Sequence, residues 1–325
     1  KEELMSSGTL DQGFNVLDPT KFRDPDTTAR GERRASVELH RLETLWFNSG
    51  TLCNLACANC YIESSPTNDR LAYLSLDEVQ TYLDEIKCDG WPVREIGFTG
   101  GEPFMNPDII DIIELCLDRG FEVLVLTNGM RPMMKLSEPL RALNRRLGAR
   151  LTVRVSLDHY TQACHELERG RHSWQPTING IKWLSDNSFT VNVAGRTCWQ
   201  ESEASLRAGY AALFVELGIA VDAEDQAVLR FFPEMDEQVD VPEITVACWG
   251  ILTVDPRGMM CAGSRMVVKR NTADAPVVMP CTLLPYDPKF EMGHTLKQAS
   301  GTVKLNHPHC AKFCVLGGGS CSVAD

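Results

Sequence analysis

The alternation of short apolar runs with amphipathic stretches is the feature that most constrains the fold of this chain. Helical periodicity occupies most of the intervals between the apolar runs. The runs that are typical of β-strands lie at 42–47, 94–100, 121–127, 151–157, 189–195 and 227–232. Repeated strand–helix units build a parallel sheet or barrel, because a crossover helix must bring the chain back before the next parallel strand begins. We therefore expect an α/β fold whose functional residues lie on loops at the carboxyl ends of the strands.

Two of the helical stretches carry recognisable boundaries. Ser75 and Glu78 have the spacing of a capping box, and Asn106 and Pro107 start a second helix that Gly120 ends. The apolar stripe of this second helix consists of Ile109, Ile112, Ile113, Cys116 and Leu117.

Composition bears on where the protein works. No apolar run approaches the roughly 20 residues that cross a bilayer, and the first residues contain nothing like the apolar core of a signal peptide. We therefore expect a cytoplasmic protein with no membrane contact. The 13 cysteines are then more easily explained by metal binding or chemistry than by a disulfide framework.

Charge limits the class of partner. The formal net charge of −12 argues against nucleic acid, whose binding depends on basic contacts to phosphate, and it allows a polycationic small-molecule substrate. Residues 222–243 carry eight carboxylates and a single base, Arg230. This segment is either a solvated acidic loop or a surface that steers a polycation; in the second case Asp222, Glu234 and Asp236 are the candidate substrate contacts.

Three thiols are crowded into the loop that follows the first strand. The stretch "TLCNLACANCY", 51–61, places Cys53, Cys57 and Cys60 at spacings of four and three. A [4Fe–4S] cluster normally has four thiolate ligands, so one held by three leaves one iron open to an outside ligand. The alternative is a structural zinc site, which needs a fourth ligand; the nearest candidate, Cys88, lies in the first helical region.

A second motif, "FTGGEPFMNP" at 98–107, follows the second strand. Together with the C-x3-C-x2-C loop it resembles the radical S-adenosylmethionine superfamily. The resemblance implies a partial (βα)6 TIM-like barrel, here residues 40–243 after an N-terminal extension, 1–39. It also implies that the open iron chelates the amino and carboxylate groups of S-adenosylmethionine. The reduced cluster then cleaves the sulfonium to a 5′-deoxyadenosyl radical, with the electron supplied by a flavodoxin or ferredoxin type of donor.

The resemblance also assigns cofactor contacts. Gly100 and Gly101 let backbone approach the methionine end of the cofactor, and Glu102 accepts from its ammonium group. Asn128 and Ser156, at the ends of the third and fourth strands, are assigned to polar groups of the cofactor.

The adenine contact departs from the family pattern. The family usually has an aromatic residue just before the third cysteine, where this chain has Asn59, with Tyr61 directly after the cysteine. Tyr61 is accordingly the candidate for packing against the adenine.

The tail after residue 244 has a different character. Helical periodicity fades, and six of the 13 cysteines fall between 248 and 321, so that folding of residues 244–325 is expected to need a metal centre. The tail resembles the auxiliary-cluster domains called SPASM or twitch. Cys261 and Cys281 bracket an expected hairpin, and Cys310 and Cys314 lie one turn apart on an expected helix. By resemblance these four hold a second [4Fe–4S] cluster, and Cys321 is a further candidate ligand.

Two histidines precede the last cysteines. His307 and His309 suggest zinc, whereas a histidine beside Pro308 is more often a turn residue.

Cys248, at the start of "CWGILTVDPRGMMC", allows two interpretations. It is either another cluster ligand, as in the longer SPASM pattern, or a hydrogen-atom donor on a strand that enters the auxiliary domain. The second interpretation predicts an epimerase, with Cys248 returning hydrogen to the face opposite abstraction. The resemblance of these motifs to those of a radical epimerase implies that the inverted centre is an unactivated sugar carbon of an aminoglycoside. The alternatives are a twitch-type dehydrogenase of an aminoglycoside alcohol, a peptide maturase, and a non-catalytic metal-binding module, which would leave "GGEP" unexplained.

Overall fold

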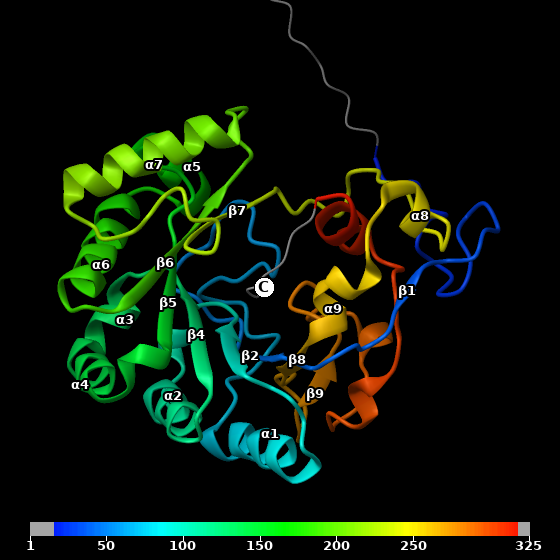
Figure 1. Ribbon diagram of the computed structural model, residues 1–325, viewed down its shortest axis with the longest axis horizontal. Coiled ribbons are helices and arrows are strands. Elements are labelled where there is room, and N and C mark those ends of the chain that lie inside the picture. The colour runs from blue at the N-terminus through cyan, green and yellow to red at the C-terminus, as the bar shows by residue number, and fades with distance from the viewer. Residues whose placement is uncertain (1–15, 318–325) are drawn as a thin grey trace, which may run out of the picture.

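The computed structural model describes residues 16–317 of the chain. Its centre is a mostly parallel sheet in the order β7-β6-β5-β4-β3-β2-β8-β9, with helices along its outer side (Figure 1). Strands β2 to β7 are parallel to their neighbours and fall within two residues of the six predicted runs. Their bounds are Thr44–Asn48, Glu95–Thr99, Glu122–Thr127, Leu151–Ser156, Thr190–Arg196 and Leu229–Phe232. The predicted α/β fold with a parallel sheet is confirmed.

Except for α3, the helices that alternate with these strands are longer than the helices of the tail. Their bounds are α1 Leu76–Asp89, α2 Ile109–Asp118, α3 Arg131–Lys135, α4 Ser137–Leu147, α5 Gln162–Arg169, α6 Trp174–Asp186 and α7 Glu203–Leu217. None of the helices in the described part of the chain is long and apolar enough to span a membrane.

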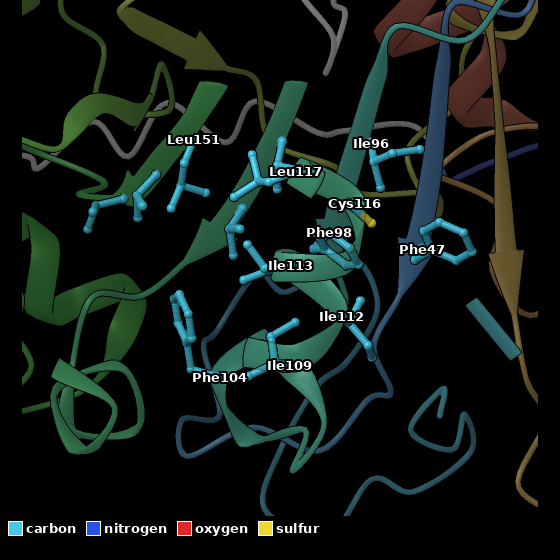
Figure 2. Close-up of a cluster of buried hydrophobic side chains, with 14 of the residues drawn as sticks. Phe47, Ile96, Phe98, Phe104, Ile109, Ile112, Ile113, Cys116, Leu117 and Leu151 are labelled. Atoms are coloured by element: carbon cyan, nitrogen blue, oxygen red, sulfur yellow. The ribbon is translucent and has the colours of Figure 1, made fainter. Parts of the chain in front are cut away.

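Local sequence signals account for the ends and the inner faces of these helices. The capping box of α1 is present: the amide of Glu78 donates to Ser75 Oγ at 3.3 Å, and the amide of Ser75 donates to Glu78 Oε2 at 2.9 Å. All five stripe residues of α2 are buried, in a cluster that Phe47, Ile96, Phe98 and Leu151 share (Figure 2). The stripe therefore fixes α2 against the sheet.

The tail extends the sheet of the barrel. Strand β8, Ser264–Val268, pairs in parallel with β2, and β9, Val277–Met279, returns antiparallel to β8. The hairpin predicted between Cys261 and Cys281 is thereby confirmed. The sheet is continuous across the expected boundary at residue 244, so the domain limits stay a prediction.

A second core cluster joins the tail to the N-terminal segment. Phe22 and Val37 are buried in the same cluster as Met266 and Phe313. Strand β1, Ser36–Val37, also pairs antiparallel with β10, Val303–Lys304. Helices α8, Cys248–Leu252, and α9, Met260–Gly263, and a π-helix at Cys310–Val315 complete the tail.

Candidate functional site

A cavity of about 200 Å³ lies where the loops after the parallel strands meet. Both predicted motifs contribute to it, as do the ends of β4, β5 and β6. Its polar lining includes Cys53, Cys57, Cys60, Gly100, Gly101, Asn128, Arg154, Ser156, Asp158, Glu168, Arg169 and Arg196. The position agrees with the expectation that the carboxyl ends of the strands hold the site.

The cysteine loop presents all three predicted thiols to this cavity. The amides of Leu55 and Ser64 donate to the sulfurs of Cys53 and Cys60, each at 3.4 Å. Burial raises the pKa of the Cys53 thiol to about 12, so without metal the thiol stays protonated. Iron binding favours the thiolate, and amide donors already directed at sulfur suit a cluster in this place.

The two glycines of "GGEP" bring the second motif against the cysteine loop. The amide of Gly101 donates to the carbonyl oxygen of Gly50 at 2.8 Å. A Cβ at Gly101 would lie 2.1 Å from the carbonyl oxygen of Leu52, and one at Gly100, where φ is +131°, would lie 2.4 Å from that of Gly50. Glycine is required at both positions because backbone occupies the side-chain space.

Glu102 turns away from the cavity. Its carboxylate accepts from the Thr127 hydroxyl at 2.8 Å and from the amides of Asn128 at 2.9 Å and Phe104 at 3.2 Å. Burial raises its pKa to about 7. The geometry therefore links the "GGEP" loop to the end of β4, while the predicted contact to the cofactor's ammonium stays a prediction.

The other predicted cofactor contacts line the cavity. Asn128 donates from Nδ2 to Asn54 Oδ1 at 2.9 Å and approaches Cys53 Sγ at 3.9 Å. Ser156 and Tyr61 also belong to the lining. The third and fourth strands thus deliver polar side chains beside the thiols, as predicted.

A charged group that no sequence motif predicted borders the cysteine loop. Arg169, at the end of α5, donates to both oxygens of Asp158 at 2.9 and 3.1 Å. Burial opposes its charge, but Asp158 and Cys57 together raise the pKa of Arg169 above its ordinary value. Glu168 accepts from Asn59 Nδ2 with both oxygens at 3.0 Å, which joins α5 to the loop. Of this group only Asp158 had a sequence signal, because it lies two residues after Ser156 at the end of the fourth predicted strand.

Four of the predicted auxiliary ligands surround a second, smaller cavity of about 20 Å³. Cys261, Cys281, Cys310 and Cys314 all line it, and His309 does so as well. Cys310 and Cys314 lie on the same helix, as predicted, although its hydrogen-bonding pattern is that of a π-helix. Cys321 lies outside the described residues.

The remaining predicted residues lie apart from both cavities. Asp222, Glu234 and Asp236 are exposed and are absent from the lining of the first cavity. Cys248 is half-buried beside Thr245, whose hydroxyl lies 3.4 Å from Cys248 Sγ. It begins helix α8, so the expectation that it lies on a strand is wrong, because the chain turns at residues 245–248 instead of extending. Cys248 lines neither cavity.

Comparison with known proteins agrees with the geometry. Residues 47–200 match the model of the radical SAM superfamily. Over 168 residues the chain is 35% identical to the antilisterial bacteriocin subtilosin biosynthesis protein AlbA of Bacillus subtilis, covering 51% of this chain and 35% of AlbA. Over 144 residues it is 32% identical to the AdoMet-dependent heme synthase of Methanosarcina barkeri, covering 43% of this chain and 39% of the synthase.

Solved structures show the same fold at low sequence identity. SuiB of Streptococcus suis, in its complexes with S-adenosylmethionine and with precursor peptide SuiA, has a TM-score of 0.57 and 12% identity. The match covers 78–79% of this chain and 63% of SuiB. The chain thus spans less than half the length of the two curated relatives and less than two thirds of SuiB.

The three thiols, the glycine cradle formed by Gly100 and Gly101, and the family match over residues 47–200 agree with one another. Residues 47–200 form a radical SAM superfamily domain, and membership of that superfamily implies a [4Fe–4S] cluster and S-adenosylmethionine as cofactors.

Proposed function

We propose that this protein modifies a peptide by radical hydrogen abstraction and uses an auxiliary cluster held by Cys261, Cys281, Cys310 and Cys314. The observation that carries the auxiliary role is the position of Leu283, which borders both the first cavity and the four-cysteine cavity. Phe313, next to Cys314, also lines the first cavity and stacks on Phe232 at 6.1 Å between ring centroids. The two cavities therefore share part of their walls, so that groups held by the two sets of thiols would be neighbours, as electron transfer between them requires.

The chain's own residues fit a radical reaction. When bound and reduced, the cluster and S-adenosylmethionine supply a 5′-deoxyadenosyl radical. Leu126, Phe232, Leu283 and Phe313 form an apolar side of the cavity, which keeps water away from reactive species. Glu168 holds the cysteine loop through Asn59 and the amide of Ala58, and the adjacent Arg169 ties α5 to Asp158.

The relatives and the charge of the cavity support a peptide as the substrate class. AlbA is a bacteriocin biosynthesis protein, and SuiB was solved with a precursor peptide; the heme synthase shows that the domain also serves other substrates. Three arginines, Arg154, Arg169 and Arg196, line the cavity with two carboxylates, Asp158 and Glu168, of which Asp158 is paired with Arg169. The carboxylates expected to hold a polycation lie outside it. A peptide, with carbonyl and carboxylate acceptors, suits such a lining better than a polycation does.

Deuterium transfer tests the peptide proposal. Peptides are prepared from the native organism grown in deuterated medium, and half of the pool is digested with a non-specific protease. Reconstituted protein with dithionite should place deuterium into 5′-deoxyadenosine with the intact pool only. Transfer that survives digestion would indicate a small molecule and overturn the proposal. Iron content should be about eight per chain, and about four in Cys314→Ala.

A second candidate is the epimerase, specifically conversion of neomycin C to neomycin B. It is supported by the net charge of −12, by a free thiol at Cys248, and by the motif resemblance to neomycin C epimerase. In deuterated water with neomycin C, the normal protein would install one deuterium in the product. Cys248→Ala would still cleave the cofactor but install none. Loss of auxiliary iron in that variant would make Cys248 a ligand instead, and a twitch-type dehydrogenase would need no thiol donor at all.

A further inference from the structure

Three side chains that are not assigned as ligands of either iron–sulfur cluster lie close together between the barrel and the tail. They are Glu237, on the segment after β7, and His307 and His309, just before the π-helix. One potential ligand atom from each lies within 4.8 Å of the other two. His307 Nε2 is 3.4 Å from Glu237 Oε2, and the centroids of the two imidazole rings are 4.7 Å apart. In Figure 1 the yellow-green chain that leaves β7 runs toward the red helix near the C-terminal end.

His309 is the least ordinary member of this group. Its residue is 4% exposed, and its Nδ1 is buried with no hydrogen-bond partner among residues 16–317. A buried ring nitrogen without a partner is unfavourable, and a second imidazole and a carboxylate lie next to this ring. The arrangement therefore offers three potential metal-ligand groups, and one of their atoms, His309 Nδ1, has no hydrogen-bond partner among the described residues.

We propose that Glu237, His307 and His309 bind a divalent transition metal, with Zn²⁺ as the best match. Two imidazoles and a carboxylate are a usual protein ligand set for zinc. With Zn–N and Zn–O bonds of about 2.0–2.2 Å in tetrahedral geometry, two ligand atoms lie about 3.4 Å apart, as His307 Nε2 and Glu237 Oε2 do. Three protein ligands leave the fourth position to water.

Metal binding would change one contact. The amide of His309 donates to His307 Nδ1 at 3.1 Å, so the neutral ring carries its proton on Nε2, toward Glu237. With a metal on Nε2 the proton moves to Nδ1, and this backbone contact opens.

The metal would hold together two segments that line the substrate cavity. Glu237 lies two residues after Met235, and His309 lies four residues before Phe313; Met235 and Phe313 both line that cavity. His309 also borders the four-cysteine cavity, but Glu237 and His307 do not. The site thus adjoins the four-cysteine cavity through His309 alone, and it positions the part of the first cavity's wall that the tail contributes.

Metal analysis of the anaerobically purified, iron-loaded full chain tests this inference. The normal protein should bind one Zn²⁺ per chain in addition to its iron. Glu237→Gln and His307→Ala should raise the dissociation constant for Zn²⁺ at least 100-fold while iron content stays the same. Both changed residues are outside the cavities, so the variants are expected to fold, and the exposed His40→Ala should behave like the normal protein.

Spectroscopy identifies the ligands. Co²⁺ in place of Zn²⁺ should give weak visible bands without the near-ultraviolet charge-transfer absorption of thiolate ligands. Thiolate absorption, unchanged zinc affinity in both variants, or loss of iron together with zinc would each overturn the inference.

Discussion

Substituting Gly101 by alanine tests whether the close contact between the two motif loops positions the cofactor. The new Cβ would lie 2.1 Å from the carbonyl oxygen of Leu52 and 2.7 Å from that of Thr51. Ordinary contact begins at about 3.4 Å, so the loops must separate by about 1.3 Å, because the atoms that clash are backbone. A displacement of about 1 Å at a reacting centre costs about 100-fold in rate. We expect Gly101→Ala to lower the rate of 5′-deoxyadenosine formation at least 100-fold.

The assay needs two controls. Gly258→Ala adds a Cβ in open space, with no atom within 4 Å, and should leave the rate unchanged. Gly97→Ala, on the same strand system, places its Cβ 2.3 Å from the Trp46 ring and should lower the melting temperature without selectively lowering the rate of the folded fraction. If Gly101→Ala retains its iron and cleaves S-adenosylmethionine at the normal rate, the reasoning about the glycine cradle is wrong.

Three further predictions concern stability. Burial, and then Arg169, lower the pKa of His165 to about 4 from 6.5. The neutral, buried ring therefore contributes its full stability above pH 6.5, and about 3 kcal/mol of the free energy of unfolding is lost as the pH falls toward 4. Urea unfolding of His165→Gln should lack this part of the pH dependence. Arg169→Met leaves the Asp158 carboxylate buried without its partner and should cost about 3–5 kcal/mol; adding Asp158→Asn should recover most of this loss, and a double-variant cycle that shows no coupling would contradict the pair's role. Ser75→Ala removes the cap of α1 and should lower the free energy of unfolding in urea by about 1 kcal/mol. An unchanged free energy of unfolding would mean that the capping box does not stabilise the protein.

The parts of the fold that the sequence predicted well depend on local patterns. Each barrel strand is a short apolar run bounded by a turn or a helix. The pattern of apolar residues and the residues that end the strand therefore lie within one short stretch of sequence. The stripe of α2 from Ile109 to Leu117 is recognisable because every third or fourth residue faces the sheet. The cysteine loop was predictable for the same reason, since all three thiols lie within eight residues.

The parts that were missed depend on contacts between distant segments. Arg169, at the end of α5, pairs with Asp158, just after β5; the two are only 11 residues apart, but no motif spacing in the sequence indicates that contact. The pairing of β8 with β2 joins residues more than 200 positions apart, so the tail was expected to be separate from the sheet. Glu102 has the motif position of a cofactor contact, but three nearby donors turn its carboxylate inward.

Charge shows why a whole-chain property did not predict the binding site. A net charge of −12 describes the field that a ligand meets at long range, and that field is screened within about 8–10 Å in physiological salt. The charges that line the cavity are those of Arg154, Arg196, Glu168 and the Arg169–Asp158 pair. At contact distance their Coulomb energy with a ligand exceeds that of the more distant carboxylates of residues 222–243. The acidic segment 222–243 can therefore influence how fast a charged molecule approaches, while the arginines select which chemical groups remain. Rate and selectivity then depend on different residues: neutralising Asp222 and Asp236 should change the salt dependence of association, and replacing Arg196 should change which substrate is bound.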